Sequence, residues 1–211
     1  MNEKRMPRNL LLVGAGGIGT QLSELLVAAL RRVGLQGNIT LMDADTVEAS
    51  NLGHQRFTED DIGQPKVTCL ARRLDDTTSS LRVEAVVENL RHENQLMDYD
   101  LVVVCVDRPE PRRMVHAIEA PWLDVRCSGD GWMALSSASQ PALLERMTPD
   151  HQPASCQVAG ALEAGNLEFG FAVAAAFGAQ WALQKWRGHP APVQSMGSLT
   201  YGALAFPEVS A

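Results

Sequence analysis

The residues best suited to chemistry begin with a glycine-rich turn near the start of the chain, formed by Gly14, Gly16, Gly17 and Gly19. An apolar run over residues 10–13 precedes the turn, and leucines at helical spacing follow it. Glycine lets the chain turn sharply from a strand into a helix and lets a phosphate approach the free N–H groups at the helix N-terminus. The turn therefore predicts phosphate binding, although a glycine turn can also serve only to connect a strand to a helix.

A second candidate site follows the next expected strand, residues 39–42, which ends at Asp43. In dinucleotide-binding folds an acidic residue about 20 positions past the glycines accepts hydrogen bonds from ribose hydroxyls. A polar loop comes next, and such a loop is costly to order unless it holds something. Its candidate binding side chains are Asp45, Ser50, Asn51, His54, Gln55, Arg56 and Lys66.

A third acidic candidate, Asp107, follows the apolar run 101–106, which is typical of a strand buried on both faces of a parallel sheet. The carboxyl ends of parallel strands meet at one edge of a sheet, and ligands bind there in open α/β folds. We therefore expect Asp43 and Asp107 to face one crevice. Alternatively, Asp107 could cap the helix that is expected to begin near Pro109.

The motifs DADTVEASNLGHQ and DIGQPK, following GAGGIG, resemble the family of ThiF and MoeB adenylyltransferases and the related E1 enzymes that activate ubiquitin-like proteins. The similarity runs from Leu10 to Asp107. It implies that ATP and Mg²⁺ bind here, with the glycine turn and Asp43 at the nucleotide, Asn51 and Lys66 at the phosphates, and Asp107 at the metal. Lysine and asparagine suit phosphate oxygens, and a carboxylate suits Mg²⁺. The alternative for Lys66 is a solvated position at the start of a helix.

One position departs from the family's pattern. Where the motif reads asparagine, leucine, any residue, arginine, glutamine, this chain has His54 in place of the arginine, and Arg56 follows two positions later. Histidine is mostly neutral at pH 7 and lacks the bidentate fork of arginine, so we expect Arg56 to take over that catalytic role. The alternatives are a pseudoenzyme that binds a nucleotide or a partner, and an NAD-dependent dehydrogenase, which would explain Asp43 but not the polar loop.

The resemblance further implies that the chain adenylates the C-terminal carboxylate of a small ubiquitin-like or sulfur-carrier protein and releases pyrophosphate, as a homodimer. Cys156 lies in a polar loop, where its thiolate could accept the acyl group with His151 as a base, or it could be a bystander. The chain has no CxxC pair, so we do not expect the structural zinc of many relatives. No secretion signal is expected, so we expect no disulfides either.

The remaining pattern predicts one α/β domain over residues 1–211, doubly wound and Rossmann-like, with a mostly parallel central sheet, helices on both faces, and a flexible tail at residues 1–9. Further strands are expected at 81–87, 122–125, 132–138 and within 197–206, and helices at 63–74 and 167–186. The last helix carries small residues four apart, Gly170, Ala174 and Gly178, which could pack within the monomer or in a homodimer. Arg112 and Arg113 fit either the place of a family arginine or an exposed helical face.

Composition excludes several functional classes. The 25 acidic and 18 basic residues give a net charge of -7, which argues against nucleic acid as a partner. The longest apolar stretch is shorter than the roughly 20 residues that span a bilayer, so no membrane segment is expected. The N-terminus lacks the pattern of a signal peptide, and a cytoplasmic location is therefore expected.

Overall fold

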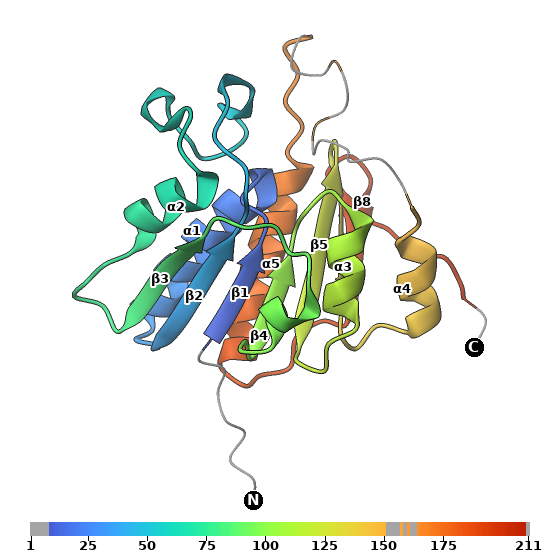
Figure 1. The fold of residues 1–211 in the computed structure, drawn as a ribbon. Helices are drawn as coiled ribbons and strands as arrows, with labels where there is room; N and C mark the ends of the chain where they lie inside the picture. The colour runs from blue at the N-terminus through green and yellow to red at the C-terminus, as the bar shows by residue number, and fades with distance from the viewer. Residues whose placement is uncertain (1–8, 151–156, 158–159, 161–163, 210–211) are drawn as a thin grey trace, which may run out of the picture.

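A single twisted sheet forms the centre of the molecule (Figure 1). The computed structural model describes residues 9–150, 157, 160 and 164–209, and within them the sheet has eight strands in the order β3-β2-β1-β4-β5-β6-β7-β8. The first five of these strands are parallel, and the last three join antiparallel. The strands are β1 Asn9–Val13, β2 Gly37–Met42, β3 Leu81–Val86, β4 Leu101–Val104, β5 Trp122–Ser128, β6 Gly131–Ser136, β7 Gln194–Ser198 and β8 Gly202–Ala203.

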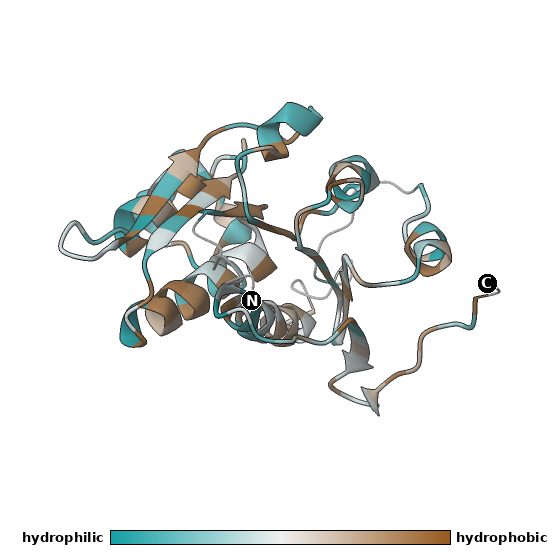
Figure 2. Ribbon diagram, turned by 90° about the horizontal axis from the view of Figure 1, so that it is seen from below, coloured by the Kyte–Doolittle hydropathy of each residue, from teal (hydrophilic) through white to brown (hydrophobic). Residues whose placement is uncertain are grey.

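Helices cover both faces of the sheet, as the sequence predicted (Figures 1 and 2). One face carries α1 Gly17–Arg32, α2 Lys66–Leu74 and α5 Gly170–Trp186, and the other carries α3 Pro109–His116 and α4 Pro141–Met147. Three short 3₁₀ helices lie in the connections: η1 Ala49–Asn51, η2 Glu59–Asp61 and η3 Glu93–Leu96. The strand order reverses between β1 and β4, and this switch point is where an open α/β sheet forms its ligand crevice.

The core is divided by the sheet into two apolar layers. In β1, Leu10 and Leu12 face α1 and α5, whereas Leu11 and Val13 face the layer that contains Val115 of α3. All four leucine and valine side chains of the strand are at most 2% exposed. Burial on both faces explains why β1 and β4 are unbroken apolar runs. In Figure 2 the central strands are coloured as hydrophobic.

Several predicted boundaries were wrong. The strand expected over 101–106 ends at Val104, because the chain leaves the sheet there toward the site. The helix expected from residue 63 begins at Lys66 after Pro65. The edge strand expected within 197–206 is two short strands, β7 and β8, joined by a turn over residues 199–201, and Gly202, with φ of +78°, begins β8. The flexible tail expected over residues 1–9 is wrong at Asn9, which begins β1, and residues 1–8 lie outside the described part of the chain. Helix α4 was not predicted.

The small residues of α5 pack within the monomer. A Cβ on Gly178 would lie 2.5 Å from Cδ1 of Leu22 in α1, and a Cβ on Gly170 would lie 2.4 Å from the carbonyl oxygen of Gly129. These contacts account for the spacing without a second copy of the chain, so the stripe gives no support to a homodimer. In the described residues, no helix combines the length and hydrophobicity needed to cross a membrane.

Candidate functional site

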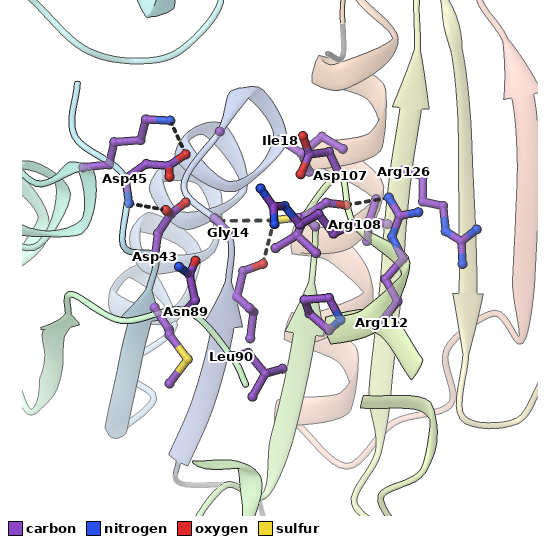
Figure 3. Close-up of a pocket in the computed structure, with 18 of the residues that line it drawn as sticks. Gly14, Ile18, Asp43, Asp45, Asn89, Leu90, Asp107, Arg108, Arg112 and Arg126 are labelled. Carbon is purple, nitrogen blue, oxygen red and sulfur yellow. Dashed lines mark hydrogen bonds and ion pairs between the residues drawn. The ribbon is translucent and has the colours of Figure 1, made fainter. Parts of the chain in front are cut away.

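A cavity of about 680 Å³ opens at the carboxyl ends of β1, β2, β4 and β5. Figure 3 shows Asp43, Asp45 and Asn89 on one side of Gly14, with Asp107, Arg108, Arg112 and Arg126 on the other. The predicted site residues that line the cavity are Gly14, Gly16, Gly17, Asp43, Asp45, His54, Gln55, Lys66 and Asp107. Asp43 and Asp107 therefore do face one crevice, as the parallel topology required.

The glycine turn is shaped by two close approaches. Gly14 has φ of +104°, a conformation that favours glycine, and its N–H donates to the carbonyl of Met42. A Cβ on Gly19 would lie only 1.9 Å from the carbonyl oxygen of Gly14, so this position lets helix α1 pack against the end of β1. Gly19 does not line the cavity. The structure therefore gives Gly19 a packing role and does not support the expected contact with phosphates. Gly16 is the N-cap of α1, whose free N–H groups face the cavity region.

Asp43 ties the glycine turn to the loop that follows β2. Its Oδ2 accepts a hydrogen bond from the N–H of Ala15 at 2.6 Å, and its Oδ1 accepts one from the N–H of Asp45 at 2.8 Å. Burial raises the pKa of Asp43 above its ordinary value, and these two hydrogen bonds oppose the rise. The carboxylate thus holds two backbone segments in place at the cavity edge.

Lys66 is buried at the first position of α2, with only 8% of its side chain exposed. Its ammonium lies 3.2 Å from Oδ2 of Asp45, whose side chain is 68% exposed. The solvated alternative for Lys66 is therefore wrong. An ammonium group has three donors, and this single contact leaves the others available to an anion in the cavity.

His54 lies in the wall of the cavity, at the position where the family motif has an arginine. The residue is 6% exposed, and its ring lies edge-on to Phe171 of α5 with centroids 6.4 Å apart. Its Nδ1 is buried without a hydrogen-bond partner in the described structure. Burial, followed by the nearby charge of Lys66, lowers the pKa of His54, so the neutral imidazole is favoured in the absence of a ligand.

Arg56 and Asn51 are not brought to the cavity. The Nε of Arg56 pairs with Oε2 of Glu24 in α1 at 3.0 Å, and 60% of the arginine side chain is exposed. Asn51 accepts a hydrogen bond from the N–H of Glu48 through its Oδ1 and so closes η1. The geometry therefore gives no support to Arg56 as a replacement for the family arginine. Cys156 and His151 lie outside the described residues.

Asp107 lines the opposite wall, where it is exposed and makes no hydrogen bond or ion pair within the described part of the chain. Helix α3 begins after Arg108 without a side-chain cap, so the capping alternative for Asp107 is not what the structure shows. An unengaged carboxylate in a polar cavity suits a Mg²⁺ ion that keeps several of its waters.

The second wall also contains a buried charge cluster that the sequence reasoning missed. Asp124 of β5 is fully buried and accepts from Arg126 at 2.6 Å and from Nε2 of His116 at 3.0 Å, while Nε of Arg112 lies 3.6 Å away. Burial opposes ionisation, but His116 and the two arginines prevail and lower the pKa of Asp124 to about 2. Charged residues two apart in a strand that is otherwise apolar were the signal that could have revealed the cluster.

Arg112 lines the cavity, as does Arg126 of the same cluster. It is 6% exposed, which rules out the exposed helical face, and its Nη2 donates to the carbonyl of Val106 beside Asp107. Arg126 instead donates to Thr148 Oγ1 and the carbonyl of Met147, and so fixes the end of α4 against β5. Arg113 lies outside the cavity and pairs with Asp150 at 2.8 Å.

Comparison with known proteins agrees with this geometry. The family model described as the ThiF family matches residues 7–206. The sulfur carrier protein adenylyltransferase of Thermus thermophilus is 37% identical over 119 residues, which are 54% of this chain and 42% of that protein. The molybdopterin-synthase adenylyltransferase of Escherichia coli is 34% identical over 111 residues, 51% of this chain and 43% of that protein, so the match spans less than half of either relative.

Solved structures share the fold at lower identity. The ATP complex of Escherichia coli MccB superposes with a TM-score of 0.70 at 19% identity, covering 94% of this chain and 64% of that one. The structure of PaaA has a TM-score of 0.67 at 16% identity, covering 93% and 62%. The family match extends over nearly the whole chain, including the glycine turn and the acidic residues that meet at its cavity. The resemblance noted in the sequence is thereby confirmed: this chain belongs to the ThiF family.

Proposed function

We propose that this chain is an ATP-dependent adenylyltransferase that activates a carboxylate and releases pyrophosphate. The observation that carries the proposal is the composition of the cavity at the switch point of the sheet. One wall offers the glycine turn, Asp43 and the buried ammonium of Lys66, which suit a ribose and a polyphosphate. The other wall offers Asp107 and the buried guanidinium of Arg112, which suit a metal ion and a second anion.

In the reaction, an oxygen of the substrate carboxylate attacks the α-phosphorus of ATP, a new acyl–oxygen–phosphorus bond forms, and the bond to pyrophosphate breaks. The protein's part is to align the two anions and to neutralise charge, since no proton has to be moved in this step. Lys66 and the N–H groups at the start of α1 neutralise phosphate oxygens. Asp107 would hold a Mg²⁺ ion, which supplies further charge neutralisation at the phosphates.

The substrate is, in this proposal, the C-terminal carboxylate of a small ubiquitin-like or sulfur-carrier protein. The names of the relatives support this choice, because they include a sulfur carrier protein adenylyltransferase and a human ubiquitin-like modifier-activating enzyme. MccB has also been solved together with MccA. A cytoplasmic location, a homodimeric state and a thioester role for Cys156 belong to the same proposal.

Nucleotide binding by the full chain tests the proposal without a protein partner. ATP with Mg²⁺ and NAD are compared by thermal shift on the wild type, Asp107→Ala and the exposed control Asp98→Ala. A ligand at about 100 times its dissociation constant adds about 2.7 kcal/mol, which moves the midpoint by several degrees. We expect stabilisation by ATP that needs Mg²⁺ and that only Asp107→Ala loses. Stabilisation by NAD alone would instead identify the site as that of a dehydrogenase.

Catalysis is then tested by exchange of labelled pyrophosphate into ATP in the presence of candidate carrier proteins. Exchange with a carrier that ends in a free carboxylate, and none with the same carrier amidated at its C-terminus, is the expected pair of results. A chain that binds ATP but exchanges pyrophosphate with none of the candidate carrier proteins would favour the pseudoenzyme.

A further inference from the structure

Two neighbouring side chains at the cavity leave buried polar atoms without partners in the described structure. They are Nδ1 of His54 and Oε1 of Gln55, and both residues line the cavity. A buried polar atom without a hydrogen bond costs about 1 to 3 kcal/mol. Since such atoms are rare in folded proteins, two of them side by side at a cavity wall indicate that the hydrogen bonding of this pair is completed only when a ligand is bound.

The imidazole of His54 lies where phosphates are expected. A Cβ on Gly17, in the first turn of α1, would be 3.7 Å from Cδ2 of the imidazole, so the ring lies beside the N-terminus of that helix. Phe171 supports the ring from the side of α5. The helix N-terminus and the buried Lys66 make this part of the cavity favourable for anions.

The groups around His54 determine its charge. Lys66 of α2 acts on the imidazole directly and is itself paired with Asp45, the N-terminus of α1 contributes partial positive charge, and α5 contributes the uncharged Phe171. Other charged groups near the site are Arg56, which is paired with Glu24, and the cavity-lining carboxylates of Asp43 and Asp107. Burial and Lys66 lower the pKa of His54, so the ring is neutral near pH 7 when the cavity holds no anion.

We propose that His54 is a phosphate contact that takes up one proton from solvent when a polyphosphate binds and gives it back when the polyphosphate leaves. This inference rests on the proposed binding of ATP. The imidazolium ring has two N–H donors. One donates to a phosphate oxygen. The other donates to Oε1 of Gln55. In the structure the amide nitrogen of Gln55 lies 3.4 Å from Nε2 of His54, and a half-turn of the amide group brings its oxygen to that place.

The consequence is a nucleotide affinity that depends on pH. An opposite charge within about 4 to 6 Å raises the pKa of a histidine by one or more units. One unit corresponds to a tenfold change in affinity. Binding of ATP is therefore expected to weaken severalfold from pH 6 to pH 8, because the full tenfold for each unit is reached only between a pH below the pKa of the free ring and a pH above that of the bound ring. An arginine at the same position would stay charged over this range and would give no such dependence.

Isothermal titration of the full-length chain with ATP and Mg²⁺ measures the proton directly. Titrations at pH 7 in two buffers of different ionisation enthalpy give the number of protons taken up per ATP. The wild type and the exposed control His189→Gln are expected to take up a measurable fraction of a proton at pH 7, which grows with the rise in the pKa of His54, and His54→Gln and His54→Arg are expected to take up none. Adenosine, which has no phosphate, serves as the control ligand and is expected to cause no uptake.

The variants also separate this inference from the proposed function. His54→Arg is expected to bind ATP at pH 8 at least as tightly as the wild type does at pH 6, with no dependence on pH. The inference would be overturned if the wild type binds ATP without taking up a proton, or if His54→Gln takes up as much as the wild type does. Either result would leave the adenylation site intact. Absence of ATP binding by the wild type would overturn both. Urea unfolding of His54→Gln and His54→Arg checks that both variants are folded.

Discussion

Replacing Asp124 with asparagine removes the negative charge from the buried cluster that supports the second wall of the cavity. The carboxylate accepts hydrogen bonds from Arg126 and His116 and lies 3.6 Å from Nε of Arg112. Removing one partner of a buried ion pair costs about 3 to 5 kcal/mol, because the remaining charges stay buried without compensation. We expect Asp124→Asn to lower the free energy of unfolding at pH 7 by an amount in this range.

The pH dependence of this loss follows from the pKa of Asp124. The folded pKa is lowered from 3.8 to about 2, so the carboxylate contributes about 2 to 3 kcal/mol of stability at neutral pH. Because the folded pKa lies below the unfolded one, this contribution is fully present above about pH 5 and is lost as the pH falls toward 2. About half of it should be gone by pH 3. The difference between the wild type and Asp124→Asn should therefore shrink over the same range.

Urea unfolding followed by tryptophan fluorescence at pH 7, 5, 4 and 3 provides the measurement. Asp130→Asn is the matched control, since Asp130 accepts hydrogen bonds from Ser198 and Thr200 at the surface. Asp124→Leu combined with Arg126→Met should recover part of the loss, because an apolar pair can replace a buried ion pair. A difference below about 1 kcal/mol at pH 7, or one that does not change down to pH 3, would refute a stabilising role for the charge.

Four further substitutions test the geometry of the glycines and of Arg56. In urea unfolding, Gly19→Ala should destabilise the chain by about 3 kcal/mol, because its Cβ would lie 1.9 Å from a backbone oxygen. Gly16→Ala should cost under about 1 kcal/mol, because the space around its Cβ is open. Arg56→Ala should leave the dissociation constant for ATP within about threefold of wild type in titration calorimetry, because an exposed ion pair away from the cavity contributes little. Gly178→Leu should lower the free energy of unfolding by about 1 to 3 kcal/mol through crowding against α1, without adding or removing a dimer in light scattering.

The arrangement of the sheet and the position of the crevice could be predicted from sequence. Unbroken apolar runs identify strands that are buried on both faces, and parallel strands place their carboxyl ends at one edge. For this reason Asp43 and Asp107, which are 64 positions apart in the chain, could be placed at one cavity before any coordinates were known. The glycine turn was predictable on the same basis, except that Gly19 serves packing and not the ligand.

Side-chain directions in the polar loop could not be predicted in this way. His54 and Arg56 are two positions apart in a loop without a regular period, so sequence alone does not say which of them faces the cavity. The structure decides through a contact that is distant in sequence: Glu24 of α1 pairs with Arg56 and holds it on the outside of the loop. The cluster around Asp124 could not be predicted for a different reason: apolar residues identify its strand, but they do not say which charged side chains from α3 and β5 meet beside it.

The position of Arg56 changes what the departure at His54 means for catalysis. With Arg56 held by Glu24, the fixed positive charge at the cavity comes from Lys66 and the N-terminus of α1, and Arg112 supplies charge from the opposite wall. If His54 takes up a proton as proposed, it adds to these charges only while an anion is bound. Because the developing charge of a departing pyrophosphate is itself such an anion, a histidine can supply the charge at the moment it is needed. We therefore expect the loss of the family arginine to make activity dependent on pH without abolishing it, so that pyrophosphate exchange declines toward pH 8 in the wild type and stays level in His54→Arg.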